Sequence, residues 1–138
     1  MDKIFVDTNV VIDFLGNRFP FADSAEDLFS LVSEKRVELY VSAASFDNIY
    51  YILRKKIGHA ELIKSLKNFV KYITIVDLDA KSVMNALDSK LDDFEDALQH
   101  ECALKIKNIK AIVTRDRKGF ARSIIPAMTV TDYLKTIN

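Results

Sequence analysis

The sequence has 138 residues, which suits one domain able to bury roughly two thirds of the surface that its unfolded chain exposes. A hydrophobic content of 49% argues against a disordered chain, and three glycines and two prolines are too few for an all-β fold with many tight turns. Twenty basic and twenty acidic residues cancel, so any binding to nucleic acid must use a local patch of charge.

The single cysteine, Cys102, excludes an internal disulfide and fits a reducing compartment, where we expect it to be a small buried residue. The first residues lack a charged segment followed by a long apolar core, because Asp13 interrupts the apolar run after Asn9. No apolar run approaches the ~20 residues that span a bilayer. We therefore expect a soluble, cytoplasmic protein with no signal peptide and no membrane partner.

Hydrophobic periodicity predicts strands and helices that alternate along the chain. In chain order the predicted elements are a strand at 3–6, helices at 9–15 and 22–36, a strand at 37–42, helices at 45–56 and 60–72, a strand at 73–78, helices at 79–89 and 93–107, a strand at 111–114, a short strand within 127–131 and a helix at 132–137. Strands separated by helices form a parallel sheet covered on both faces. The prediction is one α/β domain over residues 1–138, a three-layer α/β/α sandwich around a mostly parallel central sheet.

Acidic residues follow two of the predicted strands. Asp7 comes directly after the first strand, and Asp116 comes two residues after the strand at 111–114. Because ligands bind beyond the carboxyl ends of parallel strands, we expect these two side chains at one edge of the sheet. An acid directly after a buried strand is costly unless something pairs with it. The alternatives are a solvated loop for Asp7 and a surface ion pair with a flanking arginine for Asp116.

A third group of acids lies in "DDFED", where four of five residues are acidic. Helical geometry places Asp93, Asp96 and His100 within a sector of roughly 60°. Another side of this helix can face the core and carries Phe94, Leu98 and Cys102. The alternative is an ordinary helix start, with Asp93 as N-cap and Asp96 completing a pair that resembles a capping box. His100 is equally compatible with an ordinary surface or core histidine.

Clustered carboxylates repel one another, and burial adds a desolvation cost. A divalent cation would relieve both, and oxygen ligands suit Mg²⁺ or Mn²⁺, which bind through one or two carboxylates plus substrate phosphates. Zinc is a poor match, because the chain has no cysteine pair and only His59 and His100. A carboxylate-held metal can activate water or stabilise charge on a phosphate.

Taken together, these residues resemble the PIN domain, the nuclease fold of VapC-type toxins and related ribonucleases. "VDTNVVID" resembles the family's opening motif, which implies Asp7 as its first metal carboxylate and Asn9 as the polar residue that orients the site. "DFEDALQHECA" resembles the third motif, which implies Asp96 as a metal ligand and Asp93 as an auxiliary acid. "IVTRDRKGF" resembles the last motif. Its polar and acidic positions are Thr114 and Asp116.

The second motif is where this chain departs from the family. A Glu usually stands early in the helix after the second strand, but "SFDNIYYIL" has Asn48 there, with Asp47 one residue before. Asn48 can coordinate through its carbonyl oxygen or hold a water, but it has no charge and cannot act as a general base. Asp47 points about 100° away on a helix and is an imperfect substitute. One fewer charge should weaken metal affinity, and Gly119 also stands where many relatives have an acid.

The resemblance implies hydrolysis of RNA phosphodiester bonds with Mg²⁺ or Mn²⁺ held by Asp7, Asp96 and Asp116. It also implies a cognate antitoxin and a homodimer. Basic residues border the predicted site and could hold phosphates with salt-dependent affinity. They are Arg115, Arg117 and Lys118. Three aromatic residues could stack on bases or pack in the core, namely Tyr50, Tyr51 and Phe120.

Two other functions stay open. A catalytically weakened PIN module could bind RNA or a protein partner without cleavage, and Asn48 is the feature that favours it. A haloacid-dehalogenase-type phosphatase would use Asp7 as nucleophile, since "DTNVV" weakly echoes its Asp-x-Asp loop. That loop needs an acid where this chain has Asn9, and the chain is short for that fold and its cap.

Overall fold

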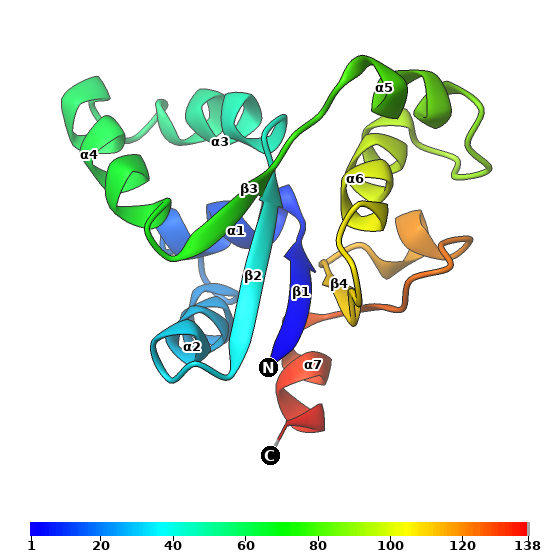
Figure 1. Ribbon diagram of the computed structural model, residues 1–138. Coiled ribbons are helices and arrows are strands. Elements are labelled where there is room, and N and C mark those ends of the chain that lie inside the picture. Colours follow the sequence, from blue (N-terminus) through cyan, green and yellow to red (C-terminus); the bar gives the residue numbers. More distant parts are fainter. Residues whose placement is uncertain (138) are drawn as a thin grey trace.

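The computed structural model describes residues 1–137 and has the predicted α/β architecture (Figure 1). The elements of that range, in chain order, are β1 (Asp2–Val6), α1 (Thr8–Leu15), α2 (Ala22–Ser33), β2 (Val37–Ser42), α3 (Ser45–Leu53), α4 (His59–Phe69), β3 (Ile73–Val76), α5 (Ala80–Leu87), α6 (Phe94–Leu104), β4 (Ala111–Val113), the 3-10 helix η1 (Arg117–Phe120), β5 (Ala127–Met128) and α7 (Val130–Thr136). None of these helices is long and apolar enough to cross a bilayer.

The five strands of the described range form one sheet in the order β3-β2-β1-β4-β5. Each pair of neighbours is parallel, so the predicted parallel sheet is confirmed. β1 is central, with Phe5 beside Tyr40 of β2 on one side and beside Ile112 of β4 on the other. The carboxyl ends of β1 and β4 are therefore neighbours at one edge of the sheet.

Alternate side chains of the central strands pack into two separate cores. On β1, Ile4 and Val6 belong to the core shared with α1, α2, α3, α4 and α7, whereas Phe5 belongs to the core shared with α6 and η1. β4 repeats the alternation, with Val113 in the first core and Ile112 in the second. Figure 1 shows the helices on both faces of the sheet. The predicted three layers are confirmed.

The structure corrects the ends of several elements. Most helices stop two or three residues earlier than predicted, where charged residues follow the last packed position; α6, for example, ends at Leu104 before Lys105. Asn108 then turns the chain toward β4 with a positive φ of 64°. The short 3-10 helix η1 was not predicted, because four residues are too few for a periodic pattern.

The packing face of α6 also differs from the prediction. Phe94, expected in the core, is 47% exposed because it is the first residue of the helix. Small side chains let α6 approach the sheet instead, and Ala97, Cys102 and Ala103 are all buried. The prediction that Cys102 is a small buried residue is confirmed, and burial raises the pKa of its thiol.

Candidate functional site

Asp7 lies directly after β1 at the carboxyl edge of the sheet and is only 6% exposed. Its carboxylate has two fixed donors. The backbone N–H of Thr8 donates to Oδ1 at 2.8 Å, and the Thr114 hydroxyl donates to Oδ2 at 2.7 Å. Burial raises the pKa of Asp7, the two hydrogen bonds oppose that change, and the charges of Glu95 and Asp116 add to it. A buried carboxylate is thus held in one orientation without a cationic partner in the described chain.

Thr114 connects Asp7 to the next acid. While its hydroxyl donates to Asp7, the Oγ1 atom accepts a hydrogen bond from the backbone N–H of Asp116 at 3.0 Å. Asp116 is exposed, and its Oδ1 accepts from the Gly119 N–H at 3.2 Å, which caps η1. No arginine or lysine of residues 1–137 forms an ion pair with Asp116, so the predicted alternative of a surface ion pair is wrong.

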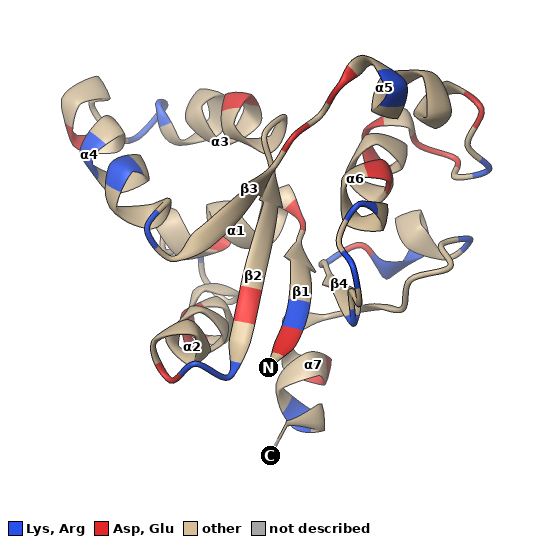
Figure 2. Ribbon diagram, in the orientation of Figure 1, with Lys and Arg blue, Asp and Glu red and all other residues tan. Residues whose placement is uncertain are grey.

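Helix α6 brings Asp96 to the same edge of the sheet. Burial raises its pKa to about 7, and the negative charges of Asp7, Asp93 and Asp116 act in the same direction. Asp93 is the N-cap of α6, because its Oδ1 accepts the Asp96 N–H at 3.0 Å. The capping alternative for Asp93 is confirmed, while its role as an auxiliary acid stays a prediction. Figure 2 shows acidic segments both on α6 and where β1 runs into α1.

Gly119 shows how close the acids from α6 and η1 come. A Cβ atom built on Gly119 would overlap Asp96 Oδ2 and would lie 2.8 Å from Asp116 Oδ2. Both carboxylates therefore occupy the space that a side chain at this position would need. The sequence showed that Gly119 lacks the acid of many relatives, but only the structure shows that its missing side chain leaves room for two others.

The donor set fits a hydrated divalent cation of the Mg²⁺ or Mn²⁺ kind. It consists of hard carboxylate oxygens, and in residues 1–137 none of Asp7, Asp96 and Asp116 has a cationic partner. As these side chains stand, no three acids, histidines or cysteines in that range could hold one ion together. Mg²⁺ keeps several waters and needs only one or two protein carboxylates, so the Asp96 and Asp116 pair suffices.

Comparison with known proteins agrees with this geometry. A sequence model of the PIN domain matches residues 3–118, which include Asp7, Asp96 and Asp116. The chain belongs to the PIN-domain family. Among curated proteins, no sequence matches it.

Two solved structures show that the whole fold is shared with PIN-domain proteins. VapBC2 from Rickettsia felis, bound to a DNA fragment from its promoter, is 19% identical with a TM-score of 0.68, over 91% of this chain and 96% of that one. VapC20 from Mycobacterium tuberculosis, a toxin that cleaves the sarcin-ricin loop, is 18% identical with a TM-score of 0.69, over 88% of this chain and 96% of that one. The predicted PIN-like fold is confirmed.

Behind the PIN-domain acids lies a buried polar network that the sequence did not reveal. The hydroxyls of Thr8 and Ser45 are hydrogen-bonded at 2.7 Å, and Gln99 Nε2 donates to Ser45 Oγ at 3.1 Å and to Thr8 Oγ1 at 3.4 Å. All three residues are buried. The network joins α1, α3 and α6 at the point where the acids converge. The only signal for it was the helical spacing of Gln99 from Asp96.

The residue at the second-motif position, Asn48, links two helices. Asn48, half-buried on α3, donates from Nδ2 to Oε1 of Glu95 on α6 at 3.4 Å. Both residues line a cleft of about 370 Å³ that also reaches Thr8, the neighbour of Asp7. Asn9, by contrast, is exposed, and its side chain forms no hydrogen bond within residues 1–137. Its predicted orienting role has no contact to support it.

The predicted RNA-binding residues separate into two kinds. Arg115 turns to Asp13, with 3.0 Å between its Nε and Oδ2, and its guanidinium lies 4.2 Å from the centre of the Phe21 ring. The guanidinium of Arg115 is thus engaged by Asp13 of α1 and by Phe21, the residue before α2. Arg117 and Lys118 are exposed on η1, with Arg117 only 3.8 Å from Asp132 at the surface.

Burial and contacts decide between the alternative roles of the aromatic residues and of His100. Phe120 is buried in the second core and cannot stack on a base. Tyr50 is hydrogen-bonded to His59 Nδ1 at 2.7 Å, while Tyr51 is exposed beside the cleft. His100 is a core histidine, 8% exposed, and burial lowers its pKa.

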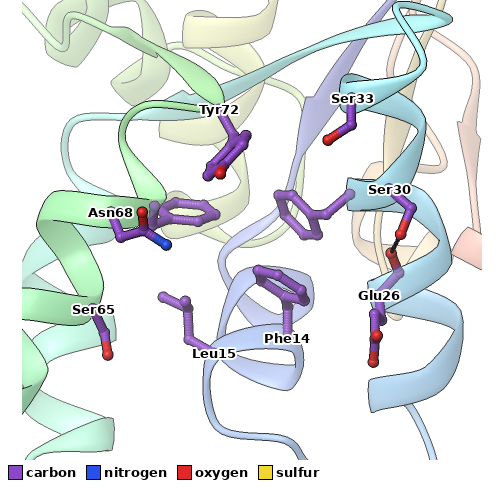
Figure 3. Close-up of a pocket in the computed structure, with 10 residues that line it drawn as sticks. Phe14, Leu15, Glu26, Ser30, Ser33, Ser65, Asn68 and Tyr72 are labelled. Carbon is purple, nitrogen blue, oxygen red and sulfur yellow. Dashed lines mark hydrogen bonds between the residues drawn. The ribbon is translucent and has the colours of Figure 1, made fainter.

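A separate groove lies away from the acids, among α1, α2 and α4 (Figure 3). Its volume is about 470 Å³, and its floor includes the stacked rings of Phe14 and Phe29, whose centres are 4.3 Å apart. Glu26 is its one charged lining residue. This groove, lined by aromatic and polar side chains, lacks the clustered acids found at the edge of the sheet.

Proposed function

We propose that this PIN-domain protein is a metal-dependent endoribonuclease of the VapC toxin type. The observation that carries the proposal is the convergence of Asp7, Asp96 and Asp116 from three separate segments, where burial and then the repulsion of the neighbouring acids raise the pKa of Asp96 to about 7. A fold that keeps unpaired acids together at the end of its central strands gains from a bound cation. The affinity of the native state for that ion then offsets the repulsion.

Asp96 and Asp116 would hold Mg²⁺ or Mn²⁺ first, and a side-chain adjustment would bring in Asp7 as the third ligand, with Asp93 adding negative charge nearby. Such a cation, when bound, supplies an activated water and stabilises charge on a phosphate. Thr114 fixes the Asp7 carboxylate and the backbone of Asp116 through one hydroxyl. Thr114 therefore acts as a positioning residue for both acids.

RNA is the proposed substrate because phosphodiesters present the oxygens that a carboxylate-bound cation coordinates. VapC20, which shares the fold, is a toxin that cleaves the sarcin-ricin loop. The chain has no net charge, so phosphate binding depends on local cations. Arg117 and Lys118 on η1 are the best placed, because they follow Asp116 directly and are exposed.

A protein partner belongs to the same proposal. VapBC2 of Rickettsia felis, a fold relative, was solved with a DNA fragment from its promoter. We infer that this chain likewise has a cognate antitoxin, that it forms a homodimer and that it acts in the cytoplasm. Gel filtration of the purified protein, alone and co-expressed with a neighbouring gene product, tests both assemblies.

A binding module without activity is the second candidate, and Asn48 in the place of the usual Glu is the observation that favours it. The two candidates differ in one measurement. Purified protein is incubated with a panel of small structured RNAs in Mn²⁺, in Mg²⁺ and in EDTA. The enzyme proposal requires cleavage in metal and none in EDTA, whereas the binding module requires retention of intact RNA.

Asp7→Asn is the control for contaminating ribonuclease. Its amide should keep the fold, since Oδ1 can accept from the Thr8 N–H and Nδ2 can donate to Thr114 Oγ1, and charge repulsion is relieved. We expect unchanged or higher melting temperature and no cleavage. Cleavage that persists in Asp7→Asn or in EDTA would overturn the enzyme proposal, and an unfolded variant would show that Asp7 is structural.

A further inference from the structure

Glu95 is a charged residue that none of the motif positions accounts for. It lies in the first turn of α6, next to Asp96, and is exposed. Within residues 1–137 no lysine, arginine or histidine forms an ion pair with it. The side-chain amide of Asn48 donates a hydrogen bond to Glu95 Oε1 at 3.4 Å. An acid held by a neutral amide keeps its full negative charge available to a cation.

The contact with Asn48 is informative because of where Asn48 stands. It occupies the α3 position at which a PIN domain usually has a Glu, and it lines the cleft that reaches Thr8, the neighbour of Asp7. In this chain the carboxylate at the end of that side chain is missing, but the carboxylate of Glu95 lies against the Asn48 amide. The negative charge reaches the same region from α6 instead of α3.

Glu95 lies in a preformed cleft close to the site acids. Glu95 and Asn48 line the 370 Å³ cleft, whose lining also includes Thr8, Ser45 and Gln99 of the buried polar network. The network holds α1, α3 and α6 together, so the cleft does not depend on a ligand for its shape. Glu95 acts on Asp7 and Asp96, since its charge contributes to the raised pKa of both.

We propose that Glu95 is the fourth acid of the site and supplies, from α6, the carboxylate that Asn48 fails to supply from α3. The inference rests on the proposed metal-dependent function. Asn48 is then a positioning residue, which donates to Glu95 Oε1 and would leave the other carboxylate oxygen to a cation. Asp47, the residue before Asn48, lines the same cleft, but within residues 1–137 its side chain forms no hydrogen bond with Glu95, and the proposal gives it no role.

The test measures Mn²⁺ binding directly, by the electron paramagnetic resonance signal of the free ion, so that it does not depend on activity. Glu95→Gln should weaken Mn²⁺ binding about tenfold or more, a loss typical of a ligand or its supporting group. Asp47→Asn removes an acid from the same cleft and Glu61→Gln removes one from α4; both should bind Mn²⁺ within about twofold of the unchanged protein. Thermal melting of each variant in EDTA confirms that it is folded.

The decisive variant moves the carboxylate from position 95 on α6 to position 48 on α3. Adding Asn48→Glu to Glu95→Gln returns the carboxylate to α3 and should restore most of the lost Mn²⁺ affinity. Equal Mn²⁺ binding by the unchanged protein and by Glu95→Gln would overturn the assignment of Glu95 while leaving the proposed function intact. Loss of affinity in Asp47→Asn but not in Glu95→Gln would assign the role to Asp47. Absence of Mn²⁺ binding by the unchanged protein would overturn both proposals.

Discussion

Asp96 is partly removed from water and has Asp7, Asp93 and Asp116 nearby, and these two causes, burial first, raise its pKa to about 7 in the absence of a cation. Burial raises the pKa of Asp7 as well. An acid that binds its proton more tightly in the native state than in the unfolded chain makes the native state lose stability as the pH rises through that interval. The effect is the reverse of that for an acid stabilised by a salt bridge.

We therefore expect the free energy of unfolding, measured in EDTA, to fall between the ordinary carboxyl pKa of 3.8 and a pH of about 7. Asp96→Asn should remove most of that fall, because the variant cannot release the proton. Urea denaturation at several pH values checks this, and saturating Mn²⁺ should raise stability most at the upper end. An identical pH dependence in Asp96→Asn would show that Asp96 titrates normally.

Site residues that follow a parallel strand could be predicted from the sequence, because ligands bind beyond the carboxyl ends of such strands. Residues placed by contacts between distant segments could not. Asp7, Thr114 and Asp116 follow parallel strands, so sequence position alone brought them to one edge of the sheet. In the sequence Arg115 is next to Asp116, and only the fold shows that it pairs with the distant Asp13 instead. Glu95 went unnoticed because its contact with Asn48 joins two helices whose relative placement no periodicity reveals.

At the scale of elements, the first turn of α6 combines two roles, since Asp93 caps the helix and lies beside a site acid. The two roles separate by substitution. Asp93→Asn keeps the cap but removes the charge, so stability should hardly change, whereas Asp93→Ala should lower the free energy of unfolding by about 1 kcal/mol. Thermal melts and Mn²⁺ titrations measure both effects. A large loss of Mn²⁺ affinity in Asp93→Asn would make Asp93 an auxiliary acid as well as a cap.

The 3-10 helix η1 is the element that allows two carboxylates to meet. Gly119→Ala would place a Cβ against Asp96 and Asp116, so we expect several-fold weaker Mn²⁺ binding and a loss of about 1 kcal/mol in stability. The matched control is Gly58→Ala, where an added Cβ meets nothing within 4 Å. Unchanged Mn²⁺ affinity in Gly119→Ala would show that the two acids can separate without consequence.

Element boundaries were less predictable than element types. Each predicted strand and helix exists in the described range, because apolar spacing follows the two cores. Most helices were predicted too long at their C-terminal ends, because residues such as Lys105 are compatible with a helix but lie past its last packed turn. η1 is held by the Asp116 cap and not by a hydrophobic pattern, so no periodic signal marked it.

At the scale of the whole molecule, Asp13 connects segments that are far apart in the sequence. It is 1% exposed on α1, accepts from Arg18 Nε at 2.9 Å, and pairs with Arg115, which follows β4. Removing one partner of a buried ion pair typically costs roughly 3–5 kcal/mol, because a charge is left unpaired. Both arginines keep about a third of their side-chain surface exposed, which lessens the penalty.

We expect Asp13→Asn to lower the free energy of unfolding by about 2 kcal/mol in urea denaturation. Asp27→Asn, an exposed acid on α2, should change it by less than about 0.5 kcal/mol. A small effect of Asp13→Asn would mean that the two arginines find water or other partners at no cost. Mn²⁺ affinity should be preserved in both variants, since the partners of Asp13 are Arg18 and Arg115 and neither variant changes a proposed metal ligand.

The strand order β3-β2-β1-β4-β5 has a consequence for when the acid site exists during protein synthesis. β1 is made first among the strands, but its second neighbour, β4, ends at Val113, and Asp116 comes later still. At ribosomal rates the interval between Asp7 and Asp116 is about 5–20 s. A nascent chain can pair β1 with β2 early, yet it has no complete set of carboxylates until nearly all of the domain has left the ribosome. Under the proposed function, metal binding and any cleavage that depends on it would have to wait until Asp116 has been synthesised.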